Sequence, residues 1–115
     1  MRSLQPPEQR LLEALVQADP ELRALAAESR DETGQFLEYP YLGMVAHQVV
    51  MLCRDEPDMA RLDRIFAALE DALNGDEHVT NLIGVGFLEH LKALDALDVV
   101  RERFGPKLSF WAATI

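Results

Sequence analysis

The three histidines, His47, His78 and His90, are the side chains of this sequence best suited to bind a metal ion. Glu77 and Glu89 are the carboxylates that would join them in such a site. No two histidines are four residues apart, and the adjacent Glu89 and His90 would point about 100° apart on a helix. This spacing predicts no metal site and no cofactor. We expect His47 to be a half-buried, hydrogen-bonded side chain.

A glycine pair, Gly84 and Gly86, lies within the unusually apolar stretch HVTNLIGVGFLEHL. It matches the first two glycines of the dinucleotide-binding pattern G-x-G-x-x-G, but the third position is Glu89. No strand is expected before it, so neither a dinucleotide site nor a phosphate loop is indicated. The alternative is close packing, because glycines let another backbone approach a helix at a cost of about 1 kcal/mol each.

Side chains for nucleophilic or acid–base catalysis are few or badly placed. Cys53 ends an apolar segment, where a buried and unreactive thiol is expected. Ser3, Ser29 and Ser109 are the only serines, and none lies in a G-x-S-x-G turn. The carboxylates follow solvated helix faces rather than apolar pockets. We therefore expect a protein that is not an enzyme.

The elements that would position these residues are helical almost throughout. Apolar residues recur at helical spacing, and Pro, Asp or Gly marks each boundary. The expected helices begin near Pro7, at Pro20 and at Tyr41, and then cover residues 58–74, a segment capped by Asp76, and residues 98–104. No strand–turn–strand pattern is present. The sequence predicts one all-α domain over residues 1–115, either a helical bundle or a short solenoid-like stack of five to seven helices.

The charge balance limits the classes of partner. Twenty acidic against eleven basic residues give a net charge of −9, which disfavours nucleic acid and anionic membranes as ligands. The longest uncharged run, residues 39–53, is too short to span a bilayer. The N-terminal residues have no apolar segment typical of a signal peptide, and a single cysteine fits a reducing compartment. A cytoplasmic protein is expected, whose acidity serves solubility or attracts a basic protein partner.

Two loops are the candidate partner-binding surface. Tyrosines beside carboxylates suit a cationic protein partner, because aromatic residues anchor interfaces and charges set the rate of approach. The loop at residues 30–41 contributes Asp31, Glu32, Glu38, Tyr39 and Tyr41, and the loop at residues 74–78 contributes Asp76 and Glu77. The alternative is that these side chains serve as helix caps and turn residues. For Asp76 we favour this alternative, because aspartate is a common N-cap residue.

The chain as a whole resembles a group of small bacterial helical proteins of unassigned function. The resemblance covers about residues 8–111 and depends on GQFLEYPYLGMVAHQVV and IFAALEDALNGDEHVTNLIGVGFLEHL. Some members are similar to immunity proteins of polymorphic toxin systems. The resemblance implies a protein that neutralises a toxin by binding it, and it supplies no catalytic residues.

Two other classes of function remain open. One is a homo-oligomeric structural or adaptor module, for example a homodimer, in which the apolar tail FWAATI packs between copies. The other is a helical bundle that binds a small ligand or a metal ion.

Overall fold

The structure, a computed structural model, describes residues 6–115, and every regular element in that range is helical. The elements are α1 (Pro6–Ala18), α2 (Glu21–Glu28), α3 (Glu38–Val50), η1 (Met51–Asp55), α4 (Met59–Ala72), α5 (Glu77–Asn81), η2 (Leu82–Leu88), α6 (Glu89–Ala93), α7 (Leu97–Val100), η3 (Arg101–Arg103) and α8 (Pro106–Ala112). Because η1 continues α3, η2 joins α5 to α6, and η3 continues α7, these elements form seven continuous helical segments. The all-α prediction is confirmed for the described residues.

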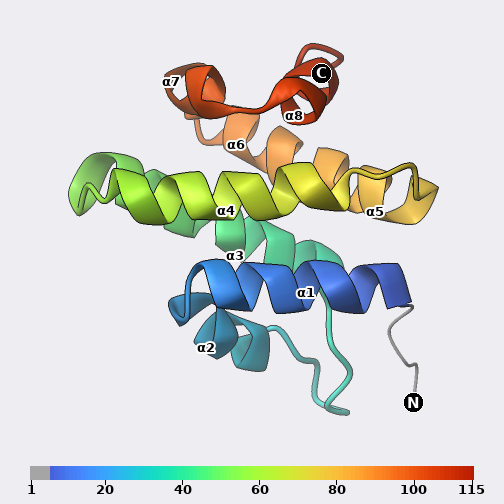
Figure 1. The fold of residues 1–115 in the computed structure, drawn as a ribbon. Coiled ribbons are helices and arrows are strands. Elements are labelled where there is room, and N and C mark those ends of the chain that lie inside the picture. Colours follow the sequence, from blue (N-terminus) through green and yellow to red (C-terminus); the bar gives the residue numbers. More distant parts are fainter. Residues whose placement is uncertain (1–5) are drawn as a thin grey trace.

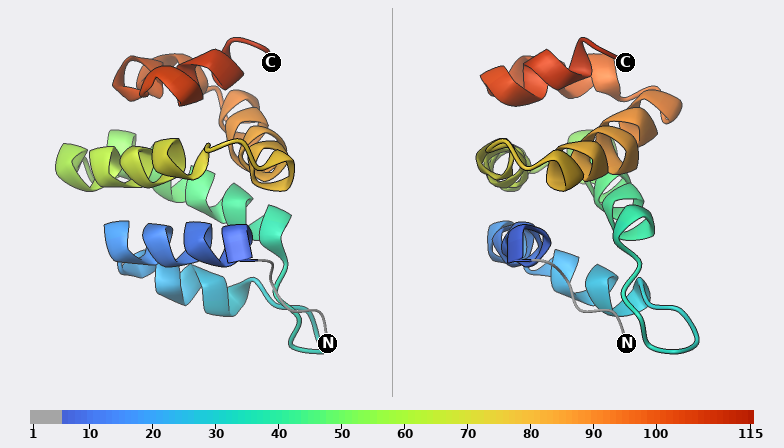
Figure 2. Two further views of the ribbon diagram at one scale, coloured as in Figure 1. Left: turned by 45° about the vertical axis from the view of Figure 1, so that its right-hand side comes forward. Right: turned by 90° about the vertical axis from the view of Figure 1, so that its right-hand side faces the viewer.

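The helices are stacked in two layers. One layer contains α1, α4 and α8, and the other contains α2, α3 and the α5–η2–α6 segment (Figures 1 and 2). Within the layers α1 packs on α4, α4 on α8, α2 on α3, and α3 on η2. The C-terminal helices α7 and α8 therefore lie at the opposite end of the stack from α2 (Figure 1). This arrangement is consistent with an all-α helical bundle, one of the two predicted forms.

Local signals explain where two central helices begin. The Asp58 carboxylate accepts a hydrogen bond from the Arg61 backbone N–H, and the Asp76 carboxylate accepts one from Val79, so each caps the helix after it. The cap predicted at Asp76 is thus confirmed. Gly75, with φ +102°, makes the turn between these helices in a conformation that favours glycine.

Two expectations about α3 and α4 were wrong. α3 begins at Glu38 rather than Tyr41, with Pro40 in its first turn, where a missing backbone N–H costs no helical hydrogen bond. In α4 the apolar residues from Met59 to Leu73 recur at helical spacing, which predicts one buried stripe, but Met59 lies at the surface in the first turn. The rest of that stripe is buried as predicted, from Leu62 to Leu73.

The segment η2 is a π-helix, whose wider turns bond each carbonyl to the N–H five residues later, a feature that the apolar periodicity of the sequence does not predict. The Glu89 N–H donates to the Gly84 carbonyl at its end. Gly86 faces α3 so closely that a Cβ atom there would lie 2.9 Å from the Cβ of Leu42. The predicted close packing is therefore confirmed for Gly86, and its partner is α3. Gly84, in contrast, faces open space.

A carboxylate from α4 fixes the position of α8. Gly105 precedes this helix and has no side chain with which to cap it. Glu70 accepts hydrogen bonds from the backbone N–H groups of Lys107 at 2.8 Å and Leu108 at 2.9 Å. A negative charge at this position also stabilises the positive end of the helix dipole. α8 is thus held on α4 through Glu70, and it buries Leu108 and Ala112 in the core.

Candidate functional site

A groove runs between the α5–η2–α6 segment and the C-terminal residues. Its volume is about 440 Å³, and its surface is mostly apolar. The residues that line it are Gly75, Glu77, Thr80, Asn81, Gly84, Val85, Glu89, Trp111 and Ile115. Because Gly84 has no side chain and nothing lies within 4 Å of the position of its Cβ, the wall of the groove is open at this residue.

Exposed apolar side chains gather at this groove. Val85 and Trp111 are both exposed, and Phe110 contacts Trp111 edge to face, with ring centroids 5.1 Å apart. α8 buries Leu108 and Ala112 against the core and leaves this aromatic pair outside. Aromatic side chains of this kind provide most of the binding energy at many protein interfaces.

The charges that line the groove are all negative. Glu77 lies on α5 and Glu89 at the start of α6, and no basic residue is among the lining residues. Twelve positions of helix separate the two carboxylates, so they lie no more than about 18 Å apart along the segment. The groove therefore combines an apolar floor with acidic ends.

A tyrosine adjoins the same groove. The Tyr39 hydroxyl accepts a hydrogen bond of 2.7 Å from the side-chain amide of Asn81, which lines the groove. Tyr39 is exposed and also lies beside Gly86, where a Cβ would be 3.6 Å from its ring. Of the two tyrosines predicted to bind a partner, Tyr39 is the one available at the surface.

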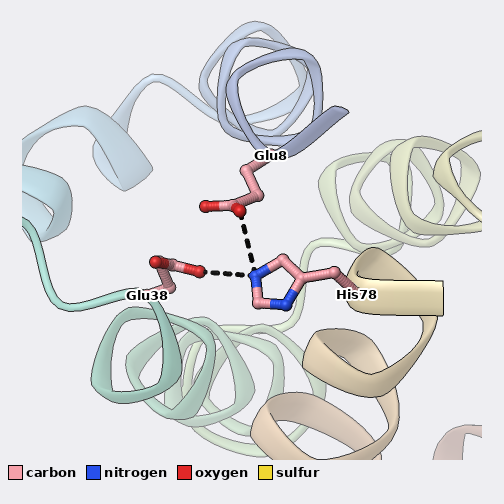
Figure 3. A group of neighbouring side chains, drawn as sticks. All are labelled: Glu8, Glu38 and His78. Atoms are coloured by element: carbon pink, nitrogen blue, oxygen red, sulfur yellow. Dashed lines mark hydrogen bonds and ion pairs between the residues drawn. The ribbon is translucent and has the colours of Figure 1, made fainter. Parts of the chain in front are cut away.

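A second cluster joins three helices that are distant in sequence. His78 Nε2 lies 3.0 Å from Glu8 Oε1 and 3.0 Å from Glu38 Oε2, so side chains from α1, α3 and α5 meet at one nitrogen (Figure 3). The glutamate side chains are only 2% and 6% exposed, whereas the histidine is 42% exposed. The cluster therefore joins two buried carboxylates to a partly exposed histidine.

The other two histidines also meet each other. His47 Nε2 and His90 Nε2 are 3.2 Å apart, and their rings are in edge contact at the surface. His90 packs over Gly43, where a Cβ would lie 3.1 Å from the imidazole. His47 is exposed rather than half-buried as expected, with the His90 ring beside it.

The predicted partner-binding residues do not form one surface. Tyr41 is buried, and its hydroxyl donates to the Leu22 carbonyl, so it is not a surface contact. Glu38 faces His78 from a buried position. Asp31 accepts hydrogen bonds from Thr33 and Gln35 and shapes its own turn. Both Asp31 and Asp76 therefore have the structural roles that were the alternative interpretation.

The remaining members of the predicted set are exposed. Glu32 is at the surface in the turn before α3, and Glu77 is at the surface on the edge of the groove. Glu77 and Tyr39 thus adjoin the groove.

The pKa of the Tyr41 hydroxyl is raised, first by burial and second by the negative charge of Asp19. The neutral phenol is therefore favoured in the folded state, whereas the unfolded chain ionises near pH 10. A raised pKa of this kind contributes stability that is present below pH 10 and is lost as the pH rises above it.

We expect the free energy of unfolding to fall above pH 10 by up to about 1.4 kcal/mol per pH unit from this group. Tyr41→Phe should remove this additional slope, while Tyr39→Phe, which alters an exposed tyrosine, should retain it. Urea unfolding between pH 9 and 11 measures both. An unchanged slope in Tyr41→Phe would contradict the assignment.

Several of the residues that make these sites were not foreseen. Glu8, Asn81 and Trp111 lie in local patterns typical of ordinary helix surfaces, and nothing in their spacing connects them to His78, Tyr39 or Gly84. Only the presence of the single tryptophan in an apolar tail could have drawn attention to the groove.

Comparison with known proteins supports one part of the resemblance, the likeness to a family of unassigned function. Residues 12–112 match a family described as a domain of unknown function (DUF7674). No curated protein and no solved structure matches the chain. The description of the family does not concern toxins, so the likeness to immunity proteins stays a prediction. No helix in residues 6–115 is both long enough and apolar enough to cross a membrane.

Proposed function

Because the chain belongs to the DUF7674 family, whose description specifies no activity, we propose from its geometry that it is a non-catalytic protein-binding module. It binds a basic, amphipathic helical segment of another protein in the groove beside α8. The observation that carries this proposal is the exposed Trp111 over an apolar groove that is open at Gly84 and has a glutamate toward each end.

The chemistry of the groove specifies the occupant. Its apolar lining would bury one face of a helix, and Trp111 and Val85 would pack against that face. Glu77 and Glu89 would attract lysine or arginine side chains about three helical turns apart. The net charge of −9 would increase the rate of approach of such a segment.

A second copy of the chain is a poorer occupant of this groove. Two copies that meet here would bring Glu77 and Glu89 toward an equally acidic surface, and like charges across an interface are unfavourable. A homodimer formed through this groove is therefore the alternative to binding of a basic segment, and the oligomeric state of the chain tests it.

A more specific form of the proposal is that the chain is an immunity-type protein and that its partner is a toxin domain. Its support is the resemblance of the sequence together with the acidity of the chain. Binding would cover a basic active-site cleft of the toxin. The contact surface proposed for this role is the groove with Tyr39 and Glu77, rather than the complete set of loop residues.

Two synthetic peptides of about 15 residues test the proposal. One carries lysines spaced to meet Glu77 and Glu89 beside a leucine face, and the other carries glutamates at the lysine positions. Fluorescence of Trp111, the single tryptophan, reports binding. We expect the lysine peptide to bind at least about tenfold more tightly, a difference of roughly 1.4 kcal/mol.

Gly84→Leu is the variant that blocks the groove. Its side chain enters open space, so the fold should be retained while affinity for the lysine peptide falls at least about tenfold. Val99→Leu is the matched control, because it adds apolar volume at an exposed helical position outside the groove. Equal affinity for both peptides, or unchanged binding by Gly84→Leu, would contradict the proposal.

Size-exclusion chromatography with light scattering tests the homodimer. A dimer that becomes monomeric in Gly84→Leu would identify a second copy as the occupant. For the toxin form, wild type but not Gly84→Leu should restore growth to cells that express a toxin encoded beside this chain.

A further inference from the structure

We propose that Glu8, Glu38 and His78 form a binding site for one divalent transition-metal ion, with Zn²⁺ as its simplest occupant. This site is separate from the groove and does not depend on the proposed protein partner. The three ligand atoms are Glu8 Oε1, Glu38 Oε2 and His78 Nε2, which all lie within 4.8 Å of one another.

The spacing of the ligand atoms is the first observation that supports the site. Both carboxylate oxygens are 3.0 Å from the imidazole nitrogen (Figure 3). Two ligand atoms that bind one ion at about 2.1 Å, with angles of about 90–110°, lie about 3.0–3.4 Å apart. The nitrogen therefore already has this spacing from each oxygen, and to bind one ion together the two carboxylate oxygens, at most 4.8 Å apart, must come within the same spacing of each other.

The number of hydrogens on the imidazole nitrogen is the second observation that supports the site. An imidazole Nε2 carries at most one hydrogen, so it can donate one full hydrogen bond, yet two carboxylate oxygens face it at the same short distance. A divalent cation in place of that hydrogen interacts with both oxygens and with the nitrogen lone pair.

The exposure of the cluster gives an ion access to it. His78 is 42% exposed, so an ion can enter from solvent and keep water molecules at its remaining coordination positions. The imidazole favours Zn²⁺ or a similar transition ion over Mg²⁺, whereas the two carboxylates also suit Mn²⁺.

The position of the cluster gives such an ion a structural consequence. Glu8 lies on α1, Glu38 begins α3 and His78 lies in the first turn of α5. An ion bound to all three would connect helices from both layers of the stack at one point (Figure 2). Because the unfolded chain does not hold these side chains together, binding should stabilise the folded state.

The experiment uses the full chain after treatment with a chelator, titrated with Zn²⁺ by calorimetry. We expect one ion per chain, and a rise in Tm of about 10 °C at a hundredfold excess over the Kd. Glu8→Gln and His78→Gln should each weaken binding at least about tenfold, because each removes one ligand. Mg²⁺ at the same concentration should change the Tm by far less.

The His47–His90 pair is the necessary control, because its nitrogens are 3.2 Å apart and could also bind Zn²⁺. The double variant His47→Gln/His90→Gln should bind one ion with unchanged affinity. Binding that is lost in this variant but kept in His78→Gln would overturn the proposal, as would the absence of binding to the wild type.

A failure of Glu8→Gln to fold would leave His78→Gln to decide the question. This side chain is nearly half exposed, so its replacement should be tolerated. Replacement of Zn²⁺ by Co²⁺ gives an independent readout, since absorption bands of a nitrogen–oxygen site should appear in the wild type and be lost in His78→Gln. Because none of these variants alters the groove, peptide binding through Trp111 separates a failure of this site from a failure of the proposed function.

Discussion

Replacing Arg61 by methionine is expected to lower the free energy of unfolding by about 3–5 kcal/mol. Asp19 is completely buried between α1 and α2, and Arg61 Nη2 on α4 lies 2.9 Å from both of its carboxylate oxygens. Methionine would retain much of the apolar volume of the arginine but would leave a buried carboxylate without its cation. Leaving such a charge uncompensated is among the most destabilising single changes in a protein.

The contacts of Asp19 predict that removing the arginine and removing the carboxylate charge will have unequal effects on stability. Gln48 donates to its carboxylate at 3.1 Å, and the Glu21 backbone N–H also donates at 3.1 Å, so these contacts remain in Arg61→Met but do not neutralise the charge. In Asp19→Asn the cation instead remains, paired with Glu21 at 3.0 Å and partly exposed to water. We therefore expect Asp19→Asn to be less destabilising than Arg61→Met.

Urea unfolding of the two variants measures the difference, and Arg103→Met is the control. Arg103 makes a similar double contact with Asp63, at 2.8 and 2.9 Å, but both side chains are exposed. The pair holds the pKa of Asp63 below its usual range, yet exposed pairs contribute little to stability because water and salt screen them. An Arg103→Met effect as large as that of Arg61→Met would show that burial is not the cause.

The sequence predicted the parts of the fold that depend on neighbours within one or two helical turns. The apolar stripe of α4 and the cap at Asp76 are local patterns, and the structure contains both. Tyr41 was misassigned for a local reason as well. Pro40 was expected to delay the start of α3, but it fits in the first turn, so Tyr41 falls on the buried face of the helix.

The candidate sites depend on which helices pack together, and periodicity does not specify this. Glu8, Glu38 and His78 are separated by 30 and 40 positions, and each occupies an unremarkable place on its own helix. The same applies to Asp19 and Arg61, which only the packing of α1 on α4 brings together. Glu77 and Glu89, the carboxylates considered with the histidines in the sequence, adjoin them along the chain, whereas His78 contacts Glu8 and Glu38 in space.

The second large effect concerns the two glycines of η2. Their replacement by alanine should change the free energy of unfolding in opposite directions. Gly86→Ala is expected to lower the free energy of unfolding by about 1–3 kcal/mol, since the added methyl group would lie 2.9 Å from the Cβ of Leu42. That atom is attached to the backbone of α3 and cannot move away by a change of rotamer. The two helices would have to separate.

Gly84→Ala should instead raise the free energy of unfolding by up to about 1 kcal/mol, because alanine favours helix and its methyl group meets nothing within 4 Å. The two variants have the same chemistry and differ by two positions, so the difference in propensity is common to both. Thermal and urea unfolding should therefore place Gly84→Ala above the wild type and Gly86→Ala below it. Destabilisation of both would indicate that the π-helical backbone itself requires glycine, whereas the observed contacts assign close packing to Gly86 and an open groove to Gly84.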